Sequence, residues 1–273
     1  MDFLKKKTLW FTVYGILITI LFLYLLFPVE LVKNKLEDST NSPDFIVKSG
    51  SLQPSLPLGI KIKNVTISST YPPNVFFRGE LLDLQFNLLS IFRKHTYVDL
   101  SGKAYGGNFD GRIGLISLAK VYPPAEGKLN FQNIDLGKYT LIGSELGRGI
   151  TGKVRGNLIY ITDEISKGIN CNLALFLTNG TYPLAEPFLG VTRIDFDHGE
   201  IRAQLKNGNI KLEKLEILGP RINCFLSGEI TPSADSKNSR LNLNGVIEIL
   251  DKNKVKMKVT ISGTLANPMI RYI

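Results

Sequence analysis

The sequence predicts a mainly β protein, in which an N-terminal transmembrane helix is followed by an elongated, curved antiparallel β-sheet domain with one or two short helices. Three observations support this fold class. An uncharged apolar run occupies residues 8–27, apolar and polar residues alternate through most of the remaining chain, and the 25 glycines fall mainly between the alternating runs. Alternation buries one face of a strand and leaves the other in water, as antiparallel sheets do.

The first element is the run from Thr8 to Phe27, which contains no charged residue. A bilayer core about 30 Å thick requires about 20 apolar residues at 1.5 Å per residue, which is the length of this run. A secretory signal has a shorter apolar region and a cleavage site of small residues. Bulky Val29, Leu31 and Val32 follow instead, so the run is interpreted as an uncleaved anchor.

Charge placement predicts the orientation of this anchor. Lys5, Lys6 and Lys7 precede it directly, and cytoplasmic flanks carry excess positive charge. Trp10 and Tyr24 lie near its ends, where aromatic rings favour the membrane interface. The predicted organisation is a cytoplasmic tail (1–7), a transmembrane anchor (8–27), a membrane-proximal linker or helix (28–42) and a β-rich domain in the periplasm or another extracytoplasmic space (43–273).

The strands of this domain are predicted from period-2 alternation in runs such as "LLDLQFNLL", "RLNLNGVIEI" and "VKMKVTI". The apolar positions slip by one residue near Asn64 and near Lys214, which predicts β-bulges and a curved sheet. Asn207-Gly208 predicts a type I′ hairpin, and reversals are also expected in "TNGTY" and at Gly199. A short helix capped by Asp135 is expected within residues 135–146.

Composition and motifs give no sign of catalysis. The net charge of +9 is interpreted as lysines on the solvated face of strands, with attraction to anionic headgroups as the alternative, and no nucleic-acid partner is expected. "GRGITGKV" has the spacing of a phosphate-binding loop, but a strand follows where that motif needs a helix. Asp195, Asp197 and His198 lack a second ligand cluster for a metal. No catalytic, cofactor-binding or metal-binding residue is predicted.

Cys171 and Cys224 occur in similar contexts, "INCNL" and "INCFL", on faces shared with apolar neighbours. One interpretation is a pair of small core residues. The alternative is a disulfide, which an oxidising compartment would permit and which would stabilise the fold by about 4 kcal/mol.

Several segments together resemble the GspN family of type II secretion proteins, which is similar to the larger AsmA-like group. They include "FPVELVKNKLE", "SLQPSLPLGIKIKNVTIS", "AYGGNFDGRIGL", "LEKLEILGPRINCFLSGEI" and "ISGTLANPMIRYI". The resemblance implies a single-pass protein of the bacterial inner membrane with a periplasmic meander of strands. It implies no catalytic or metal residue and no cofactor.

Two functions follow as expectations. In the first, the protein is a non-catalytic component of the type II secretion system that binds other secretion components through sheet edges and a basic face. In the second, it is an AsmA-like module of the cell envelope that binds or transfers phospholipid on an apolar concave face. The two differ in a structural feature, because a lipid-binding face would be left open and a packed domain would cover it.

Overall fold

The computed structural model describes residues 2–43, 45–70, 75–87, 90, 95–116, 124–139, 149–162, 168–188, 191–233, 235–250 and 255–272. Its helices are α1 (Asp2–Leu25), α2 (Val29–Thr40) and the 3-10 turns η2 (Leu136–Lys138) and η3 (Ser236–Asn238). Its strands are β1 (Phe45–Lys48), β2 (Leu52–Ser55), β3 (Gly59–Ser69), β4 (Val75–Phe86), β5 (Thr96–Ala104), β6 (Gly107–Leu115), β7 (Glu126–Asp135), β8 (Thr151–Thr162), β9 (Ile169–Phe188), β10 (Val191–Lys206), β11 (Asn209–Leu218), β12 (Ile222–Thr231), β13 (Arg240–Ile249), β14 (Val255–Gly263) and β15 (Pro268–Tyr272).

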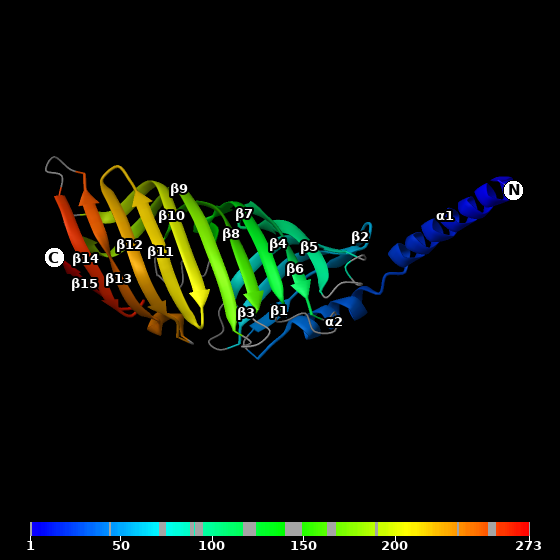
Figure 1. Ribbon diagram of the computed structural model, residues 1–273, viewed down its shortest axis with the longest axis horizontal. Coiled ribbons are helices and arrows are strands. Elements are labelled where there is room, and N and C mark those ends of the chain that lie inside the picture. The colour runs from blue at the N-terminus through cyan, green and yellow to red at the C-terminus, as the bar shows by residue number, and fades with distance from the viewer. Residues whose placement is uncertain are drawn as a thin grey trace.

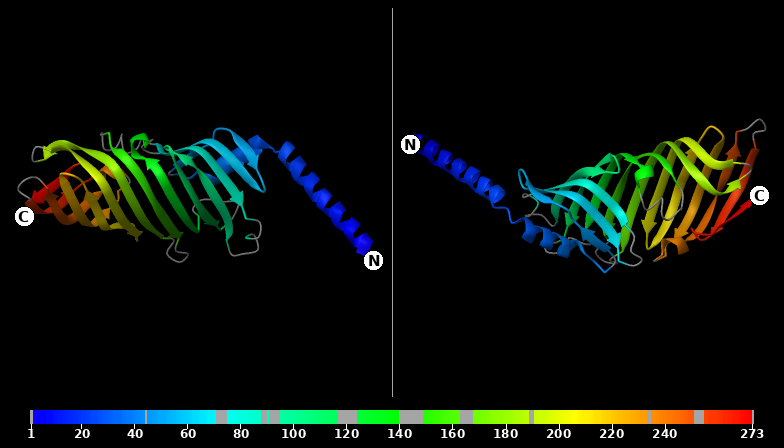
Figure 2. Two further views of the ribbon diagram at one scale, coloured as in Figure 1. Left: turned by 90° about the horizontal axis from the view of Figure 1, so that it is seen from above. Right: turned by 180° about the vertical axis from the view of Figure 1, so that it is seen from behind.

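All of these strands belong to one antiparallel sheet, which confirms the predicted β character. The hydrogen-bonded order runs β1-β3 and then follows the chain from β4 to β15, with β2 paired to β3 outside this path. At about 4.8 Å between neighbouring strands, the sheet extends for roughly 60 Å. Figures 1 and 2 show it curled about its long axis into an open trough, with α1 projecting from the end where the chain starts.

A bulge occurs near Lys214, as predicted. Arg202 pairs with Lys214 and Ala203 with Leu212, so Glu213 is the extra residue on β11. At Asn64 the backbone adopts φ 55°, and the exposed Lys63 is followed by the buried Val65 on the other side of it. The register between β3 and β4 is nevertheless unchanged across Asn64 and shifts between Ile67 and Ser68. Asn133 and Asn179 adopt the same left-handed conformation inside β7 and β9, at 56° and 48°. Asparagine tolerates this region better than most residues, and bulges increase the local bend and twist of a strand.

The predicted turns are only partly correct. Asn207 and Gly208 both have positive φ between β10 and β11, as a type I′ hairpin requires. The reversals expected in "TNGTY" and at Gly199 are wrong, because Asn179-Gly180 lies inside β9 and Gly199 inside β10. Both strands keep their partners through these positions, and the Asn-Gly pair forms a bulge in place of a turn.

The helices lie close to their predicted places. Helix α2 fills most of the membrane-proximal segment. Asp135 is the N-cap of η2, and its carboxylate accepts a hydrogen bond from the Gly137 N–H at 2.9 Å. Helix α1 starts at Asp2, so the three lysines lie in its first turns, and the cytoplasmic tail at residues 1–7 stays a prediction. Within the described part of the chain, no helix is both long enough and apolar enough to cross a membrane. The transmembrane anchor at residues 8–27 stays a prediction.

Candidate functional site

The pairing of the strands aligns hydrophobic side chains in rows that cross the sheet. In the first row, each residue is the direct partner of the next across one ladder, and every member is hydrophobic or glycine. From β2 to β15 this row contains Leu52, Ile62, Leu82, Gly102, Phe109, Phe131, Gly156, Leu175, Ile201, Leu215, Leu226, Gly245, Val259 and Tyr272.

A second row lies two residues away from the first on each strand, or three on β11 where the bulge intervenes, and it has the same composition. Its members from β2 to β15 are Pro54, Ile60, Leu84, Leu100, Gly111, Leu129, Leu158, Leu173, Ala203, Leu212, Gly228, Leu243, Ile261 and Ile270. We call the face that carries these two rows the apolar face. It contains no charged side chain in either row from one end of the sheet to the other.

Only the first strands of the apolar face are covered by a helix. Val29, Val32 and Leu36 of α2 pack against a buried cluster formed by Leu52, Ile60, Ile62 and Val65. Beyond β4, no α-helix and no second sheet among the described residues lies over the apolar face. Monomeric soluble proteins rarely leave a contiguous hydrophobic surface of more than a few hundred Å² open. The face therefore has the character of a binding surface.

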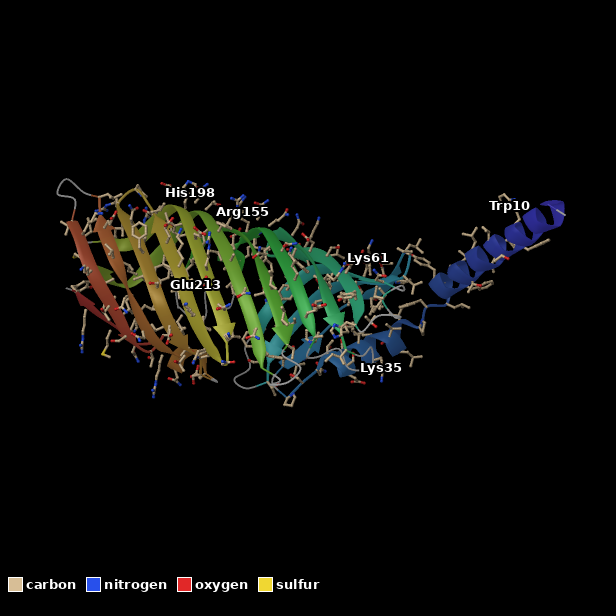
Figure 3. The ribbon with its side chains drawn as sticks, in the orientation of Figure 1. Trp10, Lys35, Lys61, Arg155, His198 and Glu213 are labelled. Carbon is tan, nitrogen blue, oxygen red and sulfur yellow. The ribbon has the colours of Figure 1, made fainter. Side chains whose placement is uncertain are left out.

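The apolar face lines the inside of the trough. Leu212 and Val259 are only 5% and 2% exposed although no covering layer lies over them among the described residues. Curvature explains this low exposure, because side chains on a concave surface converge and shield one another. Lys61, Arg155 and His198, which belong to the opposite face, project from the outer surface of the trough (Figure 3).

Glycines in the rows make room for aromatic rings. A Cβ built at Gly102 would lie 2.6 Å from the Phe109 ring, its direct partner on β6. Likewise, a Cβ at Gly180 would lie 2.2 Å from the ring of Phe196. Real Cβ atoms do not approach so closely, so glycine is required where a ring lies flat across the neighbouring strand.

The opposite face is polar and carries the ion pairs of the sheet. Glu200 lies 2.6 Å from both Lys214 and Arg202, and Arg112 lies 2.5 Å from Asp99. The hydrogen bond from Lys214, together with Arg202, holds the pKa of Glu200 below its usual value. Exposed pairs of this kind stabilise a fold only slightly. They account for the charged residues as a solvated outer surface.

The two cysteines lie on the apolar face, but they are not bonded. Cys171 is on β9 and Cys224 on β12, and both are free. Two strands separate β9 from β12, which is about 14 Å across the sheet. Cys224 is also aligned through Ile217 and Gly199 with Leu177, not with Cys171. The thiols are therefore more than about 14 Å apart, whereas a disulfide requires Cα atoms within about 7 Å. The disulfide alternative is therefore wrong for this structure. Burial raises the pKa of Cys171, and it raises the pKa of Cys224 to about 11.

The predicted membrane residues all lie on α1. Trp10 and Tyr24 are exposed on this helix. Lys5, Lys6 and Lys7 occupy its first turns, and their side chains lie outside the described residues. Tyr24 also lines a cavity between α1 and the turn that joins β2 to β3.

The motifs considered for nucleotide or metal binding form no site. Gly152 and Lys153 begin β8, in the strand context expected from the sequence, while Gly147 lies outside the described residues. Asp195 accepts a hydrogen bond from Thr181 at 3.0 Å and one from Arg193 at 3.2 Å. The part of the chain that the structure describes contains no group of three His, Cys, Asp or Glu side chains suited to a metal ion.

Sequence reasoning missed one feature, a cavity of 620 Å³ between α1 and the turn that joins β2 to β3. The signal in the sequence is the turn itself, Leu56-Pro57-Leu58, since turns are normally built from polar residues and glycine. Nothing in the sequence indicates that α1 and this turn meet.

Comparisons with known proteins identify no relative of this chain. No known protein family matches the sequence. No curated protein matches it. No solved structure matches the fold.

Proposed function

We propose that this protein binds the acyl chains of membrane lipids along its apolar face and catalyses no reaction. The observation that carries the proposal is the continuous apolar face. Within the described residues, α2 packs over it at the first strands, and Tyr105 and Tyr139 pack against it near Phe109, while no α-helix and no second sheet covers the rest. A packed domain would bury such a surface under a second layer. Hydrocarbon chains are ligands that match a trough lined by leucine, isoleucine and glycine, because they need no hydrogen bonds from its walls.

The dimensions of the trough agree with this ligand. Half of a bilayer core is about 15 Å thick, which is the span of one acyl chain. The trough is roughly 60 Å long, so it has room for several chains in succession. A length of this kind is suited to moving lipid along a surface as well as to holding it.

The proposal also includes the membrane attachment. We expect α1 to lie in the inner membrane with the N-terminus in the cytoplasm and the sheet in the periplasm. Large apolar side chains are exposed along α1, among them Phe11, Leu17 and Phe22, and three lysines precede the apolar run. A reporter enzyme fused after Ile273 should be active only in its exported form, and cytoplasmic activity would contradict this orientation.

A direct test compares neighbouring positions on the two faces of β8. Leu158 belongs to the second row of the apolar face, and Asn157 belongs to the polar face. The full chain is placed in phospholipid vesicles with the photo-crosslinking substitution Leu158→p-benzoylphenylalanine. After irradiation, residue 158 should form covalent adducts with lipid. The matched variant Asn157→p-benzoylphenylalanine should form at least tenfold fewer, as measured by mass spectrometry. Equal yields, or a protein adduct at residue 158, would contradict the proposal.

A second candidate function is protein–protein contact within a type II secretion system. It is supported by β15, the last strand of the sheet, in which Met269, Ile270 and Tyr272 are all exposed. Sheet edges bind partner strands through main-chain hydrogen bonds. Met269→Cys should cross-link to secretion components in cells, and deletion of the gene should impair protein export. Normal export together with lipid adducts would favour lipid binding alone.

A further inference from the structure

The cavity between α1 and the β2–β3 turn is built from α1, the turn and the sheet, and Val32 of α2 and the Phe27-Pro28 link also line it. Ile18, Phe22 and Leu26 of α1 form one wall, and Leu56 and Leu58 of the turn form another. The floor comes from the sheet and includes Ile60 on β3 and Phe86 on β4. Figures 1 and 2 show β2 at the end of the trough beside the end of α1. We call this space the α1–β2 cavity.

Its walls are suited to hydrocarbon and not to a polar ligand. Of the residues that the structure describes, none with a charged side chain lines the α1–β2 cavity. Among its few polar side chains, the Ser55 hydroxyl donates to Asp83 at 3.2 Å and accepts from Gln85 at 2.8 Å, so it is already satisfied. A volume of 620 Å³ lies in the range of small-molecule pockets. Apolar cavities hold water poorly, which favours an apolar occupant.

The α1–β2 cavity meets the apolar face at its first strands. Pro54 and Ile60 line the cavity and are also neighbours in the second row of that face. Val32 of α2 lines the cavity as well, and it packs against the buried cluster that contains Ile60. On the other side, Leu56 at the tip of the turn is 64% exposed and Leu26 at the end of α1 is 74% exposed. An apolar surface therefore runs from the outside of α1, through the cavity, to the first strands of the apolar face beside α2.

We infer that the α1–β2 cavity is the route by which an acyl chain passes from the bilayer onto the apolar face, with Leu56 and Leu58 inserted in the membrane interface. This inference rests on the proposed function. Exposed leucines on a turn are unfavourable in water and favourable at the acyl boundary, where each buried methylene contributes about 0.8 kcal/mol. The β2–β3 turn and α1 would then lie on either side of the site where a lipid leaves the bilayer.

The test uses the full chain in vesicles, with Leu158→p-benzoylphenylalanine as the reporter in the trough. Two probes are compared: the phospholipid of the vesicles, and a short-chain fatty acid added from water, which can reach the open trough directly. The double variant Leu56→Asp, Leu58→Asp should lower the phospholipid adduct at least tenfold and leave the fatty-acid adduct unchanged. Leu265→Asp is the matched control, because Leu265 is an exposed leucine of the β14–β15 turn at the other end of the sheet.

The outcomes separate the two proposals. If the parent protein forms neither adduct, lipid binding itself is wrong. If the double variant takes up phospholipid as well as the parent does, the access route is wrong and lipid binding stands. A fall in both adducts would also overturn the inference, since it would mean that the turn supports the sheet and does not admit lipid. If Leu265→Asp lowers the phospholipid adduct as much as the double variant does, the inference would also be overturned, because the effect would not be specific to the β2–β3 turn.

Discussion

The apolar face has a covered part and an open part, built from the same kind of strand. At β2 and β3, α2 supplies the other half of a core, and Ile62 there is 2% exposed. From β5 onward the same alternation continues, but among the described residues no α-helix covers it, and only Tyr105 and Tyr139 pack against it near Phe109. The comparison teaches that period-2 alternation specifies which face is apolar, and not what covers it. The covered part stabilises the fold, and the open part is available for a ligand.

The largest effect is expected from truncating one residue in each part of the first row. Ile62→Ala leaves a cavity under α2 and should reduce the free energy of unfolding by about 3 kcal/mol. Leu226→Ala, at a half-buried position on β12, should cost about 1 kcal/mol, because water already reaches this side chain. Thermal unfolding of the full chain in nanodiscs, followed by circular dichroism, measures both changes. Equal losses would mean that the apolar face is covered along its whole length.

The sequence alone predicts features that depend on local interactions, such as strands and turns, better than features that depend on long-range contacts. Alternation is local, so Leu82, Leu84 and Phe86 correctly predicted a strand within β4, while Leu88 of the same run lies outside the described residues. Asn207-Gly208 correctly predicted a hairpin. Asn179-Gly180 has the same dipeptide chemistry but lies inside a strand, because pairing to β8 and β10 on both sides outweighs the local turn preference. A dipeptide motif therefore does not show whether its residues pair with strands that are distant in the sequence.

The site was less accessible to sequence reasoning than the fold. The sequence indicated one apolar face per strand, but the continuity of the rows depends on register, which loops and bulges set. Phe109 and Gly102, for example, are adjacent only because β5 and β6 pair with this register. The α1–β2 cavity needs contact between segments about 30 residues apart, from Leu26 to Leu56, and no periodicity encodes that contact.

A second prediction compares thiols in the two parts. Cys224 lies in the open part and should react with iodoacetamide in the folded protein, but slowly. Its pKa of about 11, against an ordinary 9.0, leaves about 100-fold less thiolate at pH 8, and the rate should rise about tenfold per pH unit up to pH 10. Ile62→Cys, in the covered part, should react only when the protein opens.

The measurement is the alkylation rate of single-thiol variants by mass spectrometry. Cys171→Ser isolates Cys224, and the double change Cys171→Ser, Cys224→Ser provides the background for Ile62→Cys. Addition of a short-chain fatty acid should slow the reaction of Cys224 further and leave Ile62→Cys unchanged. A rate for Cys224 that levels off below pH 9 would show that its thiol is not shielded, and the burial of the open part would be smaller than the structure indicates.

The smallest effect concerns what holds α2 over the covered part. Glu37 of α2 accepts hydrogen bonds from the Ser49 backbone N–H at 2.8 Å and from the Ser49 hydroxyl at 2.6 Å. Burial raises the pKa of Glu37, but the bonds from Ser49 and the charges of Lys33 and Lys48 outweigh it, so the pKa lies below the ordinary 4.5. A lowered carboxyl pKa means that this stabilisation is present above pH 4.5 and is lost as the pH falls through the folded-state value.

Glu37→Gln should therefore weaken the contact between α2 and the sheet by about 1 kcal/mol at pH 7, since the carboxylate is partly exposed to water. Hydrogen exchange of the α2 amides should be several times faster in this variant than in the parent at pH 7, and the two should converge below pH 4. Glu30→Gln is the control, because Glu30 is an exposed residue in the first turn of the same helix. If Glu37→Gln exchanges like the parent at pH 7, the contacts of Val29, Val32 and Leu36 alone keep the covered part closed, and the difference between the two parts of the face rests entirely on hydrophobic packing.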